Sequence, residues 1–193
     1  MKAIAIIPAR VGSKRLPQKN FRQFLGKPII DWVVDEAVKS GMFDKIVVST
    51  DNADYMDNRI VIDKRPEKLL SDEVTVDEIC SELLERYKGY AYLCCIYPTA
   101  YAISARNLLD SFSFIMNFDF SYCQSVGMLN HAKYGVQYKN DNGGFYWCLI
   151  ETGEINLMKI KRGIEIPQVD INTQKDFEEA EEHARTLERF KIW

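Results

Sequence analysis

The first two thirds of the chain alternate between two patterns of apolar residues. Runs rich in apolar and β-branched residues predict strands at 2–8, 45–50, 60–62, 92–97 and 120–126. Apolar residues at helical spacing predict helices between these strands, at 28–40, 75–87 and 104–116. Strands that alternate with helices favour long crossovers and a mostly parallel sheet, and continuously apolar strands favour a sheet with helices on both faces. We therefore expect an α/β fold.

The last third has a different composition. Residues 127–163 are rich in Asn, Gly and Tyr and predict a compact, hairpin-rich segment. The strands expected there are 134–138 and 145–150. Between them, the run from Asn140 to Gly144 (Asn-Asp-Asn-Gly-Gly) predicts a turn. A strand at 164–171 and an acidic helix at 173–189 complete the pattern.

Length and charge narrow the class of protein. The 193 residues suit one domain, residues 1–193, with a single core. They carry 25 basic and 28 acidic side chains, and this balance argues against general nucleic-acid binding. No stretch is apolar for long enough to span a bilayer, and the run at 3–7 is too short for a signal-peptide core, so we expect a cytoplasmic protein without a membrane partner. The five cysteines lack metal-site spacing and suit core positions in a reducing compartment.

The stretch directly after the first predicted strand indicates chemistry. It carries the cations Arg10, Lys14, Arg15 and Lys19 among Gly12, Ser13 and Pro17. At such loops in α/β proteins, backbone N–H groups and fixed positive charges bind phosphate oxygens. The spacing matches neither a G-x-G-x-x-G dinucleotide loop nor a Walker loop. We interpret the stretch as a polyphosphate-binding loop; the alternative is a solvated basic turn.

The same stretch resembles a known signature. Pro8-Ala9-Arg10-x-Gly12-Ser13-Lys14-Arg15-x-Pro17-x-Lys19-Asn20 is similar to the loop of the acylneuraminate cytidylyltransferases, the CMP-sialic acid synthetases. Further similar segments follow in the family's order: Gly26-Lys27-Pro28, Ser49-Thr50-Asp51, Arg65-Pro66 with Ser71-Asp72, and Asp170-Ile171-Asn172-Thr173. Tyr97 after Cys94-Cys95-Ile96 resembles the pseudaminic acid branch. The resemblance covers residues 1–126 and 164–188.

The resemblance implies a Rossmann-like nucleotidyltransferase fold and a reaction. The anomeric hydroxyl of a nonulosonic acid would attack the α-phosphate of CTP, giving the CMP-sugar and pyrophosphate, with Mg²⁺ as cofactor. Arg10 and Lys19 are the implied catalytic residues, because a planar guanidinium clamps phosphate oxygens and a compact ammonium neutralises developing charge. The residues implied in nucleotide binding are Pro8, Ala9, Arg10, Gly12, Ser13, Lys14, Lys19, Asn20, Arg65, Ser71 and Asp72. Tyr97 and Thr99, after a strand at the binding edge, are the candidates for substrate contact.

Several of these residues have structural alternatives. Asn20 could cap a turn, Ser71-Asp72 could cap the helix from 75, and Tyr97 could be a core aromatic. The resemblance implies Mg²⁺ at Asp170 and Asn172, where i and i+2 of a strand face one side. The family has a second aspartate where Asn172 stands, so one ligand charge is missing. Asn172 could instead cap the helix that follows, in competition with Thr173.

Alternative functions follow from the same residues. The acceptor could be another sugar or sugar acid, and Asn172 supports a nucleotide-binding protein with weak catalysis. The segment 127–163 is shorter than the family's usual middle segment, which carries sugar contacts and a dimerisation arm, so a homodimer stays open. A structural α/β domain would leave the clustered cations unexplained.

Overall fold

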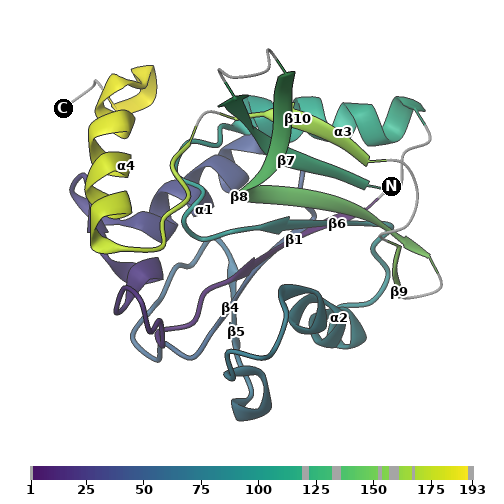
Figure 1. The fold of residues 1–193 in the computed structure, drawn as a ribbon. Helices are drawn as coiled ribbons and strands as arrows, with labels where there is room; N and C mark the ends of the chain where they lie inside the picture. Colours follow the sequence, from purple (N-terminus) through teal and green to yellow (C-terminus); the bar gives the residue numbers. More distant parts are fainter. Residues whose placement is uncertain are drawn as a thin grey trace.

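The computed structural model describes residues 2–118, 122–131, 136–151, 154–156, 161–166 and 168–190. Within this part of the chain, an eight-stranded sheet has the order β10-β7-β8-β6-β1-β4-β5, and β9 pairs with β8 (Figure 1). The strands are β1 (Ala3–Pro8), β4 (Lys45–Thr50), β5 (Val61–Lys64), β6 (Tyr92–Ile96), β7 (Tyr122–His131), β8 (Val136–Glu151), β9 (Glu154–Asn156) and β10 (Lys161–Glu165). A separate two-stranded sheet joins β2 (Gln23–Phe24) to β3 (Lys27–Pro28).

Parallel strands form the half of the sheet that the first 100 residues contribute. The strand β1 pairs in parallel with β4 and β6, and β4 pairs in parallel with β5. The later strand β8 joins β6 and β7 in antiparallel pairs, while β10 runs parallel to β7. The expected α/β fold with a mostly parallel central sheet is confirmed. Its hairpin-rich part extends the sheet beyond β6.

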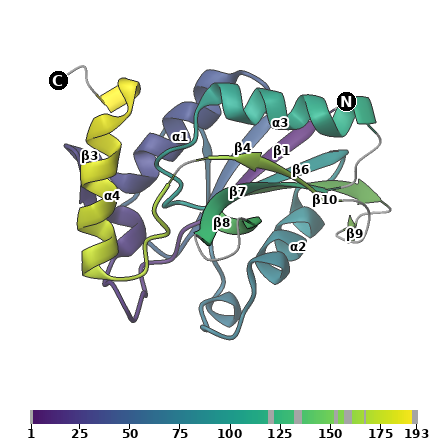
Figure 2. The ribbon, with the colours of Figure 1, turned by 45° about the horizontal axis from the view of Figure 1, so that its top comes forward.

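Helices cover both faces of the sheet, as expected. They are α1 (Ile29–Ser40), α2 (Val76–Arg86), α3 (Ala105–Phe118) and α4 (Gln174–Thr186), with short 3₁₀ turns η1 (Lys19–Phe21), η2 (Glu67–Leu69) and η3 (Glu188–Phe190). Figure 2 shows α1 and α3 on one face of the sheet and α2 on the other. Successive side chains of β1 point to opposite faces of the sheet. Ala3, Ala5 and Ile7 pack toward α1 and α3, whereas Ile4 and Ile6 pack toward α2.

Two threonines fix where α2 and α4 begin. Thr75 caps α2 and Thr173 caps α4, each in a capping box with the acidic residue three positions later. Ser71 and Asp72 therefore do not cap α2, and Asn172 does not cap α4. The α4 helix packs against Leu16, Phe24 and Tyr101 in a third apolar cluster, which ties the C-terminal part to the loop after β1 (Figure 1).

The last third differs from the prediction in two places. The run from Asn140 to Gly144 is no turn between strands; it lies inside the continuous strand β8. There the pairing with β7 shifts, so that Gln124 faces Tyr146 but Val126 faces Asp141. The predicted strand at 164–171 is also wrong, because β10 ends at Glu165 and residues 168–172 are not in a strand. The predicted strand residues 120, 121, 134, 135 and 167 lie outside the described residues.

Four of the five cysteines lie in the core, as the sequence predicts. Cys80, Cys94, Cys95 and Cys148 are buried free thiols, and the adjacent Cys94 and Cys95 enter opposite clusters on the two faces of the sheet. No helix in the described part of the chain is both long and apolar enough to cross a bilayer.

Candidate active site

A cleft of about 470 Å³ lies at the carboxyl ends of β1, β5 and β6. Its lining comprises Pro8, Arg10, Ser13, Lys14, Arg15, Lys19, Asn20, Arg65, Leu69, Ser71, Asp72, Val74, Val76, Ile79, Tyr97, Pro98 and Thr99. Since β1 stands between β6 and the pair β4 and β5 in the sheet, the loop after β1 separates the other two sides of the cleft. Ligands of parallel α/β sheets bind at this edge.

The loop after β1 is held in place by hydrogen bonds to its backbone. Ala9 N–H donates to the carbonyl of Ser49 over 2.8 Å, and Val11 N–H donates to Asp51 Oδ1 over 2.7 Å. From within the loop, Asn20 Nδ2 donates to the carbonyl of Arg10 over 2.9 Å. The loop that carries the cations is therefore fixed before any ligand binds, and Asn20 lines the cleft and braces Arg10 at the same time.

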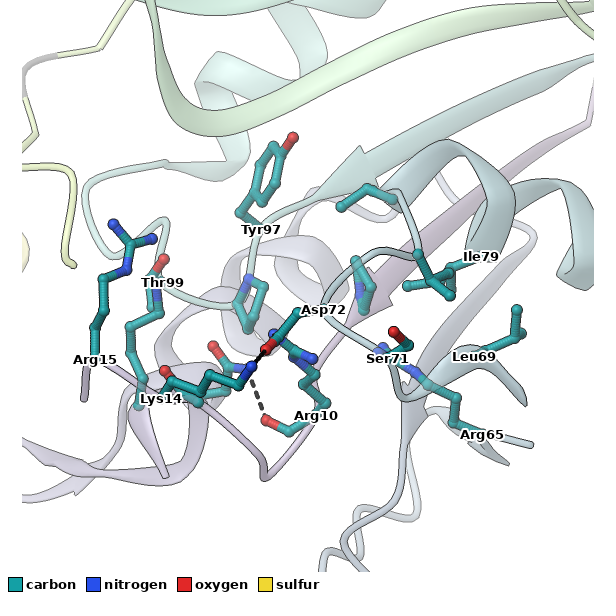
Figure 3. A pocket seen from close by; sticks show the side chains of 17 residues that line it. Arg10, Lys14, Arg15, Arg65, Leu69, Ser71, Asp72, Ile79, Tyr97 and Thr99 are labelled. Carbon is teal, nitrogen blue, oxygen red and sulfur yellow. Dashed lines mark hydrogen bonds and ion pairs between the residues drawn. The ribbon is translucent and has the colours of Figure 1, made fainter. Parts of the chain in front are cut away.

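Two of the cations share one carboxylate. Arg10 Nη2 and Lys14 Nζ both contact Asp72 (Figure 3). Arg10 Nη1 also donates to the carbonyl of Leu70 over 2.9 Å. The hydrogen bonds from Lys14 and from Arg10 lower the pKa of Asp72. The two cations for which the sequence predicts phosphate oxygens as partners are thus paired with a carboxylate of the protein. Asp72 belongs to the cleft and pairs with both cations.

Lys19 occupies a more enclosed position. Its Nζ donates to the carbonyl of Ile171 over 2.7 Å. Burial lowers the pKa of Lys19; the charge of Asp170 opposes this shift, whereas the charges of Arg15 and Arg10 add to it. The contact joins the loop after β1 to a residue 152 positions further along the chain, so it brings the first and the last of the predicted motifs together. A half-buried ammonium in this place is suited to stabilising charge on a reacting phosphate.

The side of the cleft after β5 combines a buried cation with an apolar wall. Arg65 is only 4% exposed, and its Nη2 donates to the carbonyl of Ser49 over 2.8 Å. Burial lowers the pKa of Arg65, while Asp51 favours its charged form. The wall consists of Leu69, Val74, Val76 and Ile79. A donor beside flat apolar surface is suited to the edge and face of a nucleobase.

The side after β6 carries the two predicted substrate residues. Thr99 is 7% exposed and Tyr97 is half-buried, and both line the cleft. The Tyr97 ring also lies edge-on to Tyr146, with 6.4 Å between ring centroids, so it belongs to the core and to the cleft together. In Figure 3, Arg15 and Thr99 lie toward one end of the cleft, Leu69, Ile79 and Arg65 toward the other, and Arg10, Lys14 and Asp72 between them.

The two residues predicted for Mg²⁺ contact each other directly. Asn172 Nδ2 donates to Asp170 Oδ2 over 2.9 Å, so an amide nitrogen, not an oxygen, faces the carboxylate. Asp176 Oδ2 accepts hydrogen bonds from the backbone N–H groups of Asn172 and Thr173. In the described ranges, no cluster of three or more His, Cys, Asp or Glu side chains could hold a metal ion. Neither Asp170 nor Asn172 is among the residues that line the cleft.

The structure gathers most of the predicted nucleotide residues into one place. Gly12 lies in an adjoining cavity of about 500 Å³ that shares Arg10, Ser13, Lys14, Ser71 and Asp72 with the cleft. Ala9 is fully buried behind the loop, where its backbone N–H and not its side chain contributes. The sequence interpretation missed the apolar wall, because Val76 and Ile79 belong to a predicted helix and Leu69 and Val74 lie in the segment before it. It also left Arg15 without a role, although Arg15 is one of the loop cations.

The comparisons with known proteins agree with this geometry. The profile of a family described as "Cytidylyltransferase" matches residues 4–110, more than half of the chain. This chain belongs to the cytidylyltransferase family. The matched residues contain the loop after β1, both other sides of the cleft, and the strands that carry them.

Curated members of the family provide a finer comparison. A pseudaminic acid cytidylyltransferase from Campylobacter jejuni is 37% identical over 127 residues, which are 61% of this chain and 55% of that protein. An N-acylneuraminate cytidylyltransferase from Streptococcus agalactiae is 43% identical over 94 residues, which are 46% of this chain and 23% of that protein. The matches thus span about half of the first relative and a quarter of the second.

A solved structure confirms the fold independently of sequence. The CMP:2-keto-3-deoxy-manno-octonic acid synthetase, in complex with CTP, aligns with a TM-score of 0.72 over 97% of this chain and 100% of that chain. Its sequence identity is 16%, so the likeness establishes the nucleotidyltransferase fold and carries no residue roles.

The pair Asp170–Asn172 leads to a first prediction. Replacing Asn172 with aspartate exchanges a hydrogen bond for two facing carboxylates, which we expect to lower Tm by about 2–4 °C in the presence of a chelator. Mg²⁺ should restore this loss, because two carboxylates can share one cation, and it should leave the wild-type Tm nearly unchanged. Asn172→Ala, which removes the hydrogen bond without adding charge, is the control. Equal Tm values of Asn172→Asp with and without Mg²⁺ would show that positions 170 and 172 do not face one cation.

Proposed function

We propose that this protein is a CTP-dependent cytidylyltransferase that activates a nonulosonic sugar acid. The observation that carries the proposal is the arrangement of the cleft: an apolar wall with a buried arginine, a row of cations, and a polar end, in that order. Membership of the cytidylyltransferase family supports the reaction class. The names of the relatives support an acid of the pseudaminic or N-acylneuraminic type.

The triphosphate is assigned to the middle of the cleft. Arg10 and Lys14, which Asp72 and the Leu70 carbonyl engage in the free protein, would exchange these partners for phosphate oxygens. The exchange conserves charge pairing, because each cation leaves one anion for another. Ser13 and the Gly12 backbone would line the same phosphates. The cytosine ring would lie against the wall after β5, near Arg65 and Ser71.

The chemical step requires positioning and charge stabilisation. The anomeric oxygen of the acid forms a bond to the α-phosphorus, the bond from that phosphorus to the bridging oxygen breaks, and pyrophosphate leaves with its electron pair. The hydroxyl proton passes to solvent. Lys19 is assigned to the α-phosphate, where its half-buried charge would stabilise the transition state and the leaving group.

Mg²⁺ would accompany the triphosphate and neutralise part of its charge. The hydrogen bond between Asn172 and Asp170 means that the protein offers it one carboxylate, not a chelating pair. The same observation favours the second candidate function, a nucleotide-binding protein with little turnover. A cytoplasmic location, where CTP is available and the buried thiols stay reduced, is part of the proposal.

Pyrophosphate release tests the proposal. Each nucleoside triphosphate is combined with pseudaminic acid, N-acetylneuraminic acid or an octulosonic acid, with and without Mg²⁺. We expect release with CTP and one of the nine-carbon acids only. CTP binding without release in any combination would favour the second candidate, and release with another nucleotide would contradict the assignment of the base.

A further inference from the structure

Arg15 stands apart from the other cations of the loop after β1. Arg10 and Lys14 contact Asp72, and Lys19 donates to the Ile171 carbonyl. Within the described residues, by contrast, the Arg15 guanidinium makes no hydrogen bond and no ion pair, although it lines the cleft. Its charge is therefore available to a ligand without the loss of a protein contact.

The chain fixes where Arg15 can reach. Its neighbour Leu16 is 2% exposed and packs in the apolar cluster beneath α4, which anchors this part of the loop. The exposed Arg15 side chain lies toward the Thr99 end of the cleft, away from Arg65 and the apolar wall (Figure 3). A base at the wall and a triphosphate over Arg10 and Lys14 would leave this end to the second substrate.

The electrostatics at this end favour an anion. Burial lowers the pKa of Lys19; the positive charges of Arg15 and Arg10 lower it further, whereas the charges of Asp170 and Asp176 oppose the shift. An anion bound at Arg15 would reduce this repulsion and favour the charged form of Lys19. Thr99, which is nearly buried on the same side, adds a hydroxyl that can donate to a ligand oxygen.

We propose that Arg15 binds the carboxylate of the acceptor sugar acid and thereby selects acids over neutral sugars. The inference rests on the proposed function and assigns the carboxylate of its acceptor to Arg15. In a 2-keto sugar acid, the carboxylate and the anomeric hydroxyl are attached to the same carbon. A bidentate contact from the planar guanidinium would therefore fix the nucleophile within one bond of the held group. Arg15 binds and orients the acceptor, while Lys19 acts on the phosphate.

The test combines a change in the protein with a change in the ligand. Arg15→Gln and the wild type are assayed with pseudaminic acid and with its C1 carboxamide, and KM is measured for the acceptor and for CTP. We expect Arg15→Gln to raise the KM for the acid about 10- to 100-fold, the range that a lost charge-assisted contact produces. The KM for CTP should stay within about threefold. For the carboxamide, the two proteins should have nearly equal KM values, because the contact is already absent.

A matched control removes a similar charge elsewhere. Arg106→Gln, on the exposed part of α3, should leave both KM values unchanged. An equal loss for the acid and its carboxamide, or a larger loss for CTP than for the acid, would overturn the inference by making Arg15 a phosphate or structural residue. An unchanged KM for the acid would overturn it too. If the wild type binds CTP but transfers nothing to any acid, the proposed function fails and this inference fails with it.

Discussion

Replacing Lys19 with methionine should lower kcat about 10²- to 10³-fold, the cost of removing one preorganised donor from a transition state. The effect should be large because Lys19 is half-buried and its Nζ is already fixed by the Ile171 carbonyl, so no reorganisation is required during the reaction. CTP affinity should fall much less, because in the proposed function Arg10 and Lys14 bind the triphosphate. The measurement is the comparison of kcat with the dissociation constant of CTP.

The control for Lys19 separates charge from packing. Lys19→Met also loses the bond to the Ile171 carbonyl, so Asn172→Ala, which disturbs the same segment without removing the cation, should retain most of the activity. Equal losses of kcat and CTP affinity in Lys19→Met would mean that Lys19 contributes to CTP binding and not specifically to the transition state.

The pH profile is a second readout of the same residue. Burial lowers the pKa of Lys19 below its usual value of 10.5, so the folded protein loses this charge at a lower pH than a free lysine would. Activity that needs the ammonium is therefore present at pH values below this pKa and declines as the pH rises through it. In Lys19→Arg the alkaline decline should disappear, since a guanidinium stays charged. An unchanged decline would assign it to another group.

Replacing Arg10 with alanine should weaken CTP binding about 10²-fold, because a bidentate charge-assisted contact contributes roughly 2–3 kcal/mol. Its Nη1 and Nη2 already engage two oxygen acceptors in the free protein, the Leu70 carbonyl and Asp72, and this geometry suits two phosphate oxygens. Titration of the protein with CTP, without acceptor, measures the effect directly.

Asp72→Asn is the matched control for Arg10. It breaks the same ion pair from the other side but keeps the cation. We expect it to leave CTP affinity equal or improved, because Asp72 contacts the two cations that we propose for the triphosphate, Arg10 and Lys14. If both variants weaken CTP binding by the same factor, the ion pair shapes the loop and Arg10 does not clamp phosphate.

The sequence predicts the parallel half of the fold and its binding edge well. The strand β1 shows its apolar residues without interruption, and its two faces are filled by helices whose spacing and caps are local features. Because the carboxyl ends of parallel strands meet at one edge, the loops after β1, β5 and β6 had to converge. Placing Arg10, Arg65 and Tyr97 around one cleft therefore required no knowledge of side-chain contacts.

The contacts between distant segments are what the sequence does not show. The pairing of Asp72 with Arg10 and Lys14 and the bond from Lys19 to Ile171 depend on how loops settle against each other. Local turn propensity was also overridden: the run from Asn140 to Gly144 stays in β8, where pairing with β7 on one side and β6 near Phe145 on the other holds the strand. Asp170 and Asn172 still meet although they are not in a strand.

The product of the complete reaction tests the proposed function most directly. The protein is incubated with CTP, Mg²⁺ and pseudaminic acid, and the mixture is analysed by mass spectrometry and ³¹P NMR. The proposed function predicts a CMP–sugar acid phosphodiester and pyrophosphate in equal amounts, and their near-absence with Lys19→Met. Bound CTP that is recovered intact, with every acid of the panel and without any phosphodiester, would contradict it and identify the protein as a nucleotide binder that does not transfer.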